Sequence, residues 1–138
     1  MTYTLATSLP LPWAEAVERT REALAAQGFG ILTEIDVRAT FGKKLGAEAA
    51  DAVGDYVILG ACNPALASRA LAAEPEMGAL LPCNVVVRRN GSADSTTVEA
   101  IDPQTMVQLS QSAAVKEVAD DAGARLRRVI ADLEHAAE

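Results

Sequence analysis

A predicted β-hairpin between residues 83 and 101 constrains the fold more than any other feature of the chain. Residues 83–89 are rich in valine, and residues 96–101 form a second short β-compatible run. Asn90-Gly91 begins the six-residue connection between them, and this dipeptide is typical of hairpin turns. Strands joined by so short a turn run antiparallel. At least part of the sheet is therefore expected to be antiparallel.

Three further segments are predicted as strands, at residues 3–9, 29–37 and 55–62. Residues 29–37 alternate with a period of two, which is typical of a strand with one buried face formed by Phe29, Ile31, Thr33, Ile35 and Val37. Residues 55–62 form the most hydrophobic run, so we expect a central strand covered on both faces. Together with the hairpin, these segments make a sheet of about five strands.

Proline and glycine mark where the first helices begin and end. Pro12 suits the first turn of a helix, and Gly28 is placed to end it, with Phe29 folding back on Leu24. Residues 38–45 are predicted as a short helix and residues 47–54 as a loop.

The later helices carry clear start signals. Asn63-Pro64 combines an N-cap residue with proline at the first helical position, and Pro75 ends that helix. Asp102-Pro103 repeats the signal for a short helix to about residue 109, and Ser112 can cap the last helix. That helix has an apolar stripe with steps of three or four, at Val115, Val118, Ala122, Leu126, Val129 and Leu133.

The resulting order is β-α-β-(α)-β-α-β-β-α-α. We therefore expect an α+β fold in two layers, with a mostly antiparallel sheet and helices packed on one face. The 138 residues fit a single domain, 1–138.

Composition narrows the classes of function. The chain has 12 Lys and Arg against 19 Asp and Glu, a net charge of −7, so we expect no nucleic-acid partner. Its single His, at position 135, excludes a multi-His metal site within one chain and makes Cys-His or Ser-His-Asp catalysis implausible. With no visible nucleophile–base pair and no phosphate-binding glycine loop, we favour a protein that is not an enzyme and expect no cofactor.

The N-terminal segment lacks the features of a signal peptide, and no apolar run approaches the roughly 20 residues of a membrane span. We therefore expect a cytoplasmic location and no membrane partner. Two cysteines without a recognisable spacing pattern are expected to be reduced thiols there.

Several blocks along the chain resemble the domain-of-unknown-function 302 family, and they occur in order at residues 29–37, 40–46, 58–64, 81–87 and 100–103. The resemblance implies an α+β fold similar to the TATA-binding-protein-like class, with a curved antiparallel sheet and helices behind it. It also implies homodimers, and it implies no established activity. The acidic charge of this chain argues against the DNA binding that is known for the TATA-binding protein. A shared fold does not in any case imply a shared function.

Cys62 and Cys83 are the most informative candidates for chemistry. Cys62 ends a predicted strand immediately before a helix cap, where the helix dipole favours negative charge and can make a thiol reactive. Cys83 begins the next strand, so antiparallel pairing would bring the two sulfurs close together. The pair suits thiol redox chemistry or linear Cu(I) better than zinc, which takes four ligands. The alternative is that both are small buried hydrophobes, as free cysteines usually are.

Six other residues complete the predicted ligand-binding set. Glu34 and Lys44 are candidate polar anchors at a sheet edge, and Arg69 and Glu74 flank the helix that follows Asn63. For these four the alternative is an ordinary solvated surface. Asn63 is alternatively only a helix cap, and Asn84 binds either a ligand or a neighbouring loop.

Three functions remain open on this basis. The first is a small-ligand-binding or regulatory module, with its site at the strand ends near Cys62, Asn63, Cys83 and Asn84. The second is a non-catalytic structural or dimerisation module that uses the last helix and Leu80-Leu81. The third is thiol redox or Cu(I) handling by the two cysteines.

Overall fold

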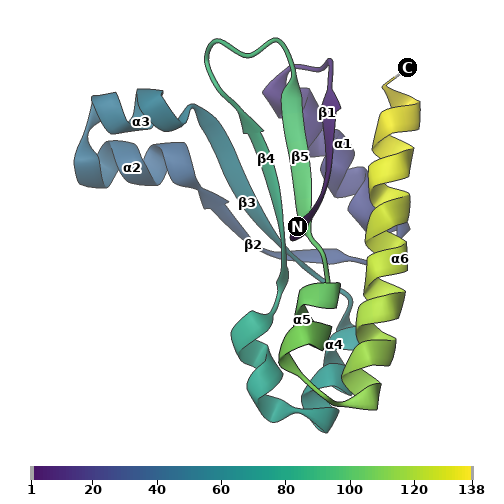
Figure 1. Cartoon of the computed structure of the whole chain (residues 1–138). Helices are drawn as coiled ribbons and strands as arrows, with labels where there is room; N and C mark the ends of the chain where they lie inside the picture. Colours follow the sequence, from purple (N-terminus) through teal and green to yellow (C-terminus); the bar gives the residue numbers. More distant parts are fainter. Residues whose placement is uncertain (1, 138) are drawn as a thin grey trace.

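Five antiparallel strands form one sheet in the order β1-β5-β4-β3-β2 (Figure 1). The computed structural model describes residues 2–137. The strands are β1 (Thr4–Leu9), β2 (Gly30–Asp36), β3 (Asp55–Cys62), β4 (Cys83–Arg89) and β5 (Thr96–Ile101). The predicted hairpin is the β4–β5 pair, and the predicted α+β class is confirmed.

Residues 2–137 also form six α-helices and one 3₁₀ helix. They are α1 (Trp13–Ala26), α2 (Val37–Leu45), α3 (Ala47–Val53), α4 (Pro64–Ala73), η1 (Pro75–Leu80), α5 (Gln104–Leu109) and α6 (Ala113–Ala136). The loop expected at residues 47–54 is wrong, because this alanine-rich segment forms α3. No helix within residues 2–137 is both long and apolar enough to cross a membrane.

The helix ends agree with the sequence signals. The Asn63 side chain accepts a hydrogen bond from the Leu66 N–H at 3.2 Å, and the Ser112 hydroxyl accepts one from the Val115 N–H at 3.4 Å. Gly28, at a φ of +83°, ends α1, and the Phe29 N–H donates to the Leu24 carbonyl at 3.0 Å. These caps satisfy backbone groups that a helix end otherwise leaves unpaired.

The buried residues form two apolar cores, one against the sheet and one among helices. In the larger core, α1 and α6 pack against one face of the sheet, where Leu59, Val87 and Val98 are fully buried. A smaller core lies below the sheet in Figure 1, where α4, η1 and α5 meet the first half of α6. The apolar stripe of α6 contributes to both cores, so the chain's own fold uses this stripe.

On the opposite face of the sheet, here called the open face, the helices within residues 2–137 form no layer of comparable extent (Figure 1). In β3, buried Val57 and Leu59 alternate with half-buried Tyr56 and Ile58. The expectation that residues 55–62 form a central strand covered on both faces is therefore wrong. The central strand is β4, and β3 lies between β4 and the edge strand β2.

A β-bulge in β2 interrupts the predicted burial pattern of that strand, and every residue from Leu32 to Asp36 is exposed. The pairing with β3 shifts between Ile31 and Thr33, which inserts Leu32 as an extra residue. Beyond the bulge, Glu34 lies opposite buried Leu59, while Ile35 lies opposite Ile58 on the open face and is 48% exposed. The predicted buried face therefore holds for the start of the strand and fails at Thr33 and Ile35.

Helices α2 and α3 form an arm that projects from the β2–β3 end of the sheet (Figure 1). No residue of these two helices, all of which the structure describes, is buried. The Arg38 guanidinium of α2 forms one ion pair with Asp51 of α3 and one with Asp55 of β3, each at 3.0 Å. The first holds the two helices of the arm together, and the second holds the arm to the sheet. The arm is therefore held mainly by local contacts.

Candidate functional site

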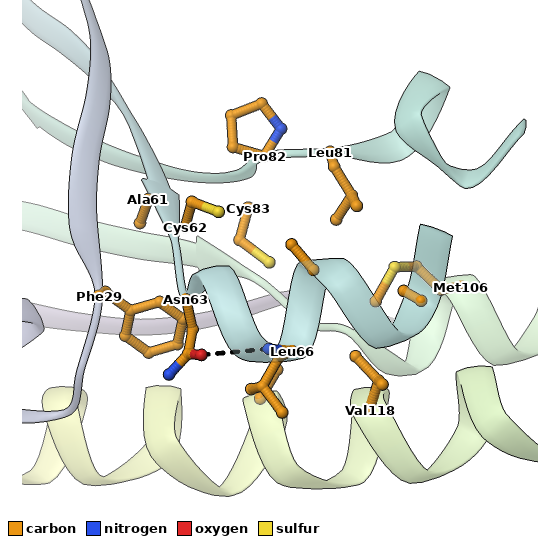
Figure 2. Close-up of a pocket in the computed structure, with 13 residues that line it drawn as sticks. Phe29, Ala61, Cys62, Asn63, Leu66, Leu81, Pro82, Cys83, Met106 and Val118 are labelled. Atoms are coloured by element: carbon orange, nitrogen blue, oxygen red, sulfur yellow. Dashed lines mark hydrogen bonds between the residues drawn. The ribbon is translucent and has the colours of Figure 1, made fainter. Parts of the chain in front are cut away.

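A cavity of about 30 Å³ lies where the ends of β3 and β4 meet α4, at the junction of the two cores (Figure 2). Its volume is close to that of one water molecule, so it admits a single ion or atom-sized group. Most lining residues are apolar, and the exceptions are two thiols and one amide. The lining consists of Phe29, Ala61, Cys62, Asn63, Leu66, Ala67, Ala70, Leu81, Pro82, Cys83, Met106, Val118 and Ala122.

Strand register brings the two cysteines to this cavity. Ala61 of β3 pairs with Cys83 of β4, so Cys62 lies one residue beyond the partner of Cys83. Both are free thiols; Cys83 is buried and Cys62 is half-buried. Burial, and in second place the thiol of Cys62, raises the pKa of Cys83 to about 11. At neutral pH the Cys83 sulfur is therefore a protonated thiol and not a ready nucleophile.

Asn63 connects the cavity to the turn that follows α1. Besides capping α4, its amide lies beside Gly28, where an added β-carbon would come within 3.0 Å of Nδ2. The same β-carbon would lie 3.3 Å from the Nη1 of Arg125, which donates to the Gln27 carbonyl at 2.9 Å. The positive φ and the close approach both favour glycine at position 28.

A larger groove of about 320 Å³ opens beside the cavity, between the end of η1, the start of β4 and α5. It is lined by Ala79, Leu80, Leu81, Pro82, Cys83, Asn84, Ile101, Pro103, Thr105 and Met106. Four of these residues also line the cavity: Leu81, Pro82, Cys83 and Met106. Asn84 is exposed at the groove, and the Thr105 hydroxyl donates to the Asp102 carbonyl at 2.9 Å. None of the described groove residues carries a formal charge.

Glu34 and Lys44 lie away from both spaces. The Glu34 carboxylate is 2.6 Å from the Arg21 guanidinium of α1, on the helix-covered side of the sheet edge. Lys44 is exposed on α2, and it is Lys43 that shares a shallow hollow with Glu34. The structure therefore does not join Glu34 and Lys44 to the cysteines.

Arg69 and Glu74 also take part in other contacts. Arg69 forms an exposed ion pair with Glu117 of α6 at 3.3 Å. The Ser110 hydroxyl donates to the Glu74 carboxylate at 2.7 Å, which ties the end of α4 to the segment before α6. Of the eight predicted residues, four lie together at the cavity and the groove: Cys62, Asn63, Cys83 and Asn84.

Sequence reasoning missed several lining residues. Leu81 and Pro82 directly precede Cys83 in the sequence, so a site at Cys83 could have been expected to include them. Met106 lies more than twenty positions further along the chain and reaches the site only through the packing of α5 against α6. Within residues 2–137, no three His, Cys, Asp or Glu side chains are grouped to hold a metal ion.

The chain resembles a solved structure of the following protein closely in fold. The crystal structure of an uncharacterised conserved DUF302 protein from Bacillus stearothermophilus superposes with a TM-score of 0.83 and 27% sequence identity, covering 96% of this chain and 99% of that chain. No curated protein matches the sequence. The model of the domain of unknown function DUF302 matches residues 4–133, nearly the whole chain. The chain therefore belongs to the DUF302 family.

Proposed function

We propose that the protein is a small-ligand-binding module whose site is the groove beside Cys83 and Asn84. The groove itself is the observation that carries this proposal. Its volume of about 320 Å³ falls in the range of small-molecule sites, which are mostly apolar with a few polar groups. Asn84 and Thr105 are the polar groups here, among apolar neighbours that include Leu80 and Met106.

The lining also indicates the class of ligand. An ionised ligand would lose hydration in this groove without gaining an opposite charge, which is costly. We therefore expect an uncharged, largely apolar molecule with one or two hydrogen-bonding groups that meet the Asn84 amide.

Binding of the uncharged dye N-phenyl-1-naphthylamine, followed by fluorescence, tests this proposal. Ala79→Trp places an indole in the groove from an exposed position and should weaken dye binding by about tenfold or more. Leu109→Trp is the matched control, because Leu109 is 72% exposed on α5 and does not line the groove. Melting temperatures of both variants check that the fold is intact.

Two results would overturn the proposal. One is that the native protein shows no dye binding. The other is that Ala79→Trp binds the dye as well as Leu109→Trp does. Ile35→Lys adds a further check, because loss of binding in this variant would place the dye on the open face instead.

A second candidate function is self-association through the open face. Ile35 is 48% exposed there, beside half-buried Ile58 and Val86, and Leu45 of the arm is 68% exposed. Arg88 and Glu99 neutralise each other on this face at 2.6 Å, so two copies would meet without strong repulsion. An isologous dimer uses one self-complementary patch in both copies.

Sedimentation velocity tests this second function. The native protein should sediment as a dimer at micromolar concentration, Ile35→Lys should sediment as a monomer, and Leu109→Lys should remain a dimer. A native protein that sediments only as a monomer would rule out self-association in this concentration range.

A further inference from the structure

We propose that Cys62 and Cys83 together bind one copper(I) ion, as a two-coordinate bis-thiolate complex in the cavity that both side chains line. The site goes beyond the ligand groove proposed above, and it does not depend on the groove being occupied.

The first argument is the position of the two sulfurs. The Ala61–Cys83 pairing brings Cys62 and Cys83 to the adjoining ends of neighbouring strands, and both line the same small cavity. Figure 2 shows the two side chains next to each other at these strand ends. They come from neighbouring strands of a hydrogen-bonded sheet, so the backbone at Cys83 and next to Cys62 is held in place by strand pairing.

The second argument is the chemistry of the cavity wall. Soft sulfur ligands select copper(I), whereas magnesium and calcium prefer oxygen ligands and structural zinc takes four ligands. No carboxylate or imidazole is among the described lining residues, and the Asn63 side-chain oxygen already caps α4. The Met106 thioether is the one other sulfur in the lining. Two thiolates and an otherwise apolar wall fit a linear copper(I) ion.

The third argument is size and charge. A cavity of about 30 Å³ accepts one ion and is far too small for an organic ligand. Binding releases two thiol protons to solvent and forms two Cu–S bonds, so the complex carries a net charge of −1. The N-terminus of α4 begins directly after Cys62 and Asn63, and its helix dipole favours negative charge at this position.

Anaerobic titration of the reduced protein with copper(I), in competition with the chelator bicinchoninate, tests the proposal. We expect one copper(I) per chain. Cys62→Ser and Cys83→Ala should each weaken binding by on the order of 100-fold or more, because one thiolate alone cannot complete the site. Met77→Leu is the matched control, because Met77 is buried in the smaller core but does not line the cavity, and it should change the affinity by less than about threefold. Zinc should not compete.

Further measurements separate loss of the site from loss of the fold. The melting temperature of each variant must show that it remains folded, and sedimentation of the loaded protein must show no copper-dependent association. X-ray absorption of the copper-loaded protein should show two sulfur neighbours. Two results would each overturn the proposal. One is a Cys62→Ser/Cys83→Ala double variant that binds copper(I) as tightly as the native protein. The other is a stoichiometry of one copper shared between two chains.

Discussion

Thr33 of β2 lies opposite Gly60 of β3, and its hydroxyl occupies the space that a side chain at position 60 would need. Pro82 approaches from the other side, with its Cγ 2.9 Å from the position of an added β-carbon. The bulge at Leu32 sets the register that places Thr33 there. Gly60 therefore lets β2 and the segment before β4 close together over β3, next to the cysteine cavity.

Gly60→Ala should destabilise the protein, because the new methyl group overlaps the Thr33 hydroxyl and the Pro82 ring, so both side chains must shift. Overpacking of this kind costs about 1–3 kcal/mol. Urea denaturation followed by circular dichroism measures the change in the free energy of unfolding.

Gly42→Ala in α2 is the matched control for this prediction. The nearest atom to an added β-carbon there is the Ala50 Cβ at 3.6 Å, an ordinary contact. Alanine is also the better helix former, so this variant should be neutral or more stable by up to about 1 kcal/mol. Equal unfolding energies for the two alanine variants would contradict the close packing at Gly60.

Much of the fold could be predicted because its signals are local. The Asn63 cap, the Gly28 helix end and the turn at Asn90-Gly91 each depend on a few neighbouring residues. The exposure of Ile35 could not be predicted, since the bulge at Leu32 is a property of strand pairing and not of β2 alone. The sequence predicts a loop over residues 47–54 because the segment is small and acidic, yet its alanines favour a helix.

One part of the candidate site could be predicted from the sequence, and the other part could not. Cys62, Asn63, Cys83 and Asn84 mark the ends of predicted strands, so antiparallel pairing was enough to group them. Met106 depends on how α5 packs against α6, which no local pattern encodes. The sequence does not show which residue pairs with Glu34. In the structure Glu34 forms an ion pair with Arg21 of α1 at the sheet edge, so it is not an anchor for a ligand at the cysteines.

Asn63→Ala should reduce stability by about 1 kcal/mol, because α4 loses the side chain that accepts the Leu66 N–H. Asn63→Asp keeps an acceptor in the same place and should retain most of the native stability. Urea denaturation of the two variants gives the comparison. If the two variants lost the same free energy of unfolding, the hydrogen bond to the Leu66 N–H would not be what Asn63 contributes to stability. The contact of Asn63 with the turn at Gly28 would then explain the loss.

Alkaline pH should destabilise the reduced protein through Cys83. Burial raises the pKa of this thiol from 9.0 to about 11, so the folded state holds the proton more tightly than the unfolded state does. This contribution is fully present below about pH 9 and is lost as pH rises toward 11, at up to about 1.4 kcal/mol per pH unit. The free energy of unfolding, measured by urea denaturation between pH 8 and 10.5, should show this slope.

Cys83→Ala is the control for the pH dependence. It removes this thiol and its electrostatic coupling to Cys62, so the difference between the two pH profiles reports Cys83 together with that coupling. Parallel profiles would mean that Cys83 is not held in an apolar environment in solution.

The arm of α2 and α3 should open far more readily than the rest of the fold, because none of its described residues is buried. Hydrogen exchange measured by mass spectrometry should show α2 and α3 exchanging at least about 100-fold faster than the second half of α6, where Leu126 and Val129 are buried. Arg38→Ala, which removes the links to Asp51 and Asp55, should increase exchange in the arm and leave α6 unchanged. The same experiment, repeated from low to high micromolar protein concentration, also tests self-association. A second copy bound to the open face and the arm would slow hydrogen exchange in those segments and leave exchange elsewhere unchanged. Slow exchange in the arm at the lowest concentration, with the protein monomeric, would contradict an arm held by local contacts alone.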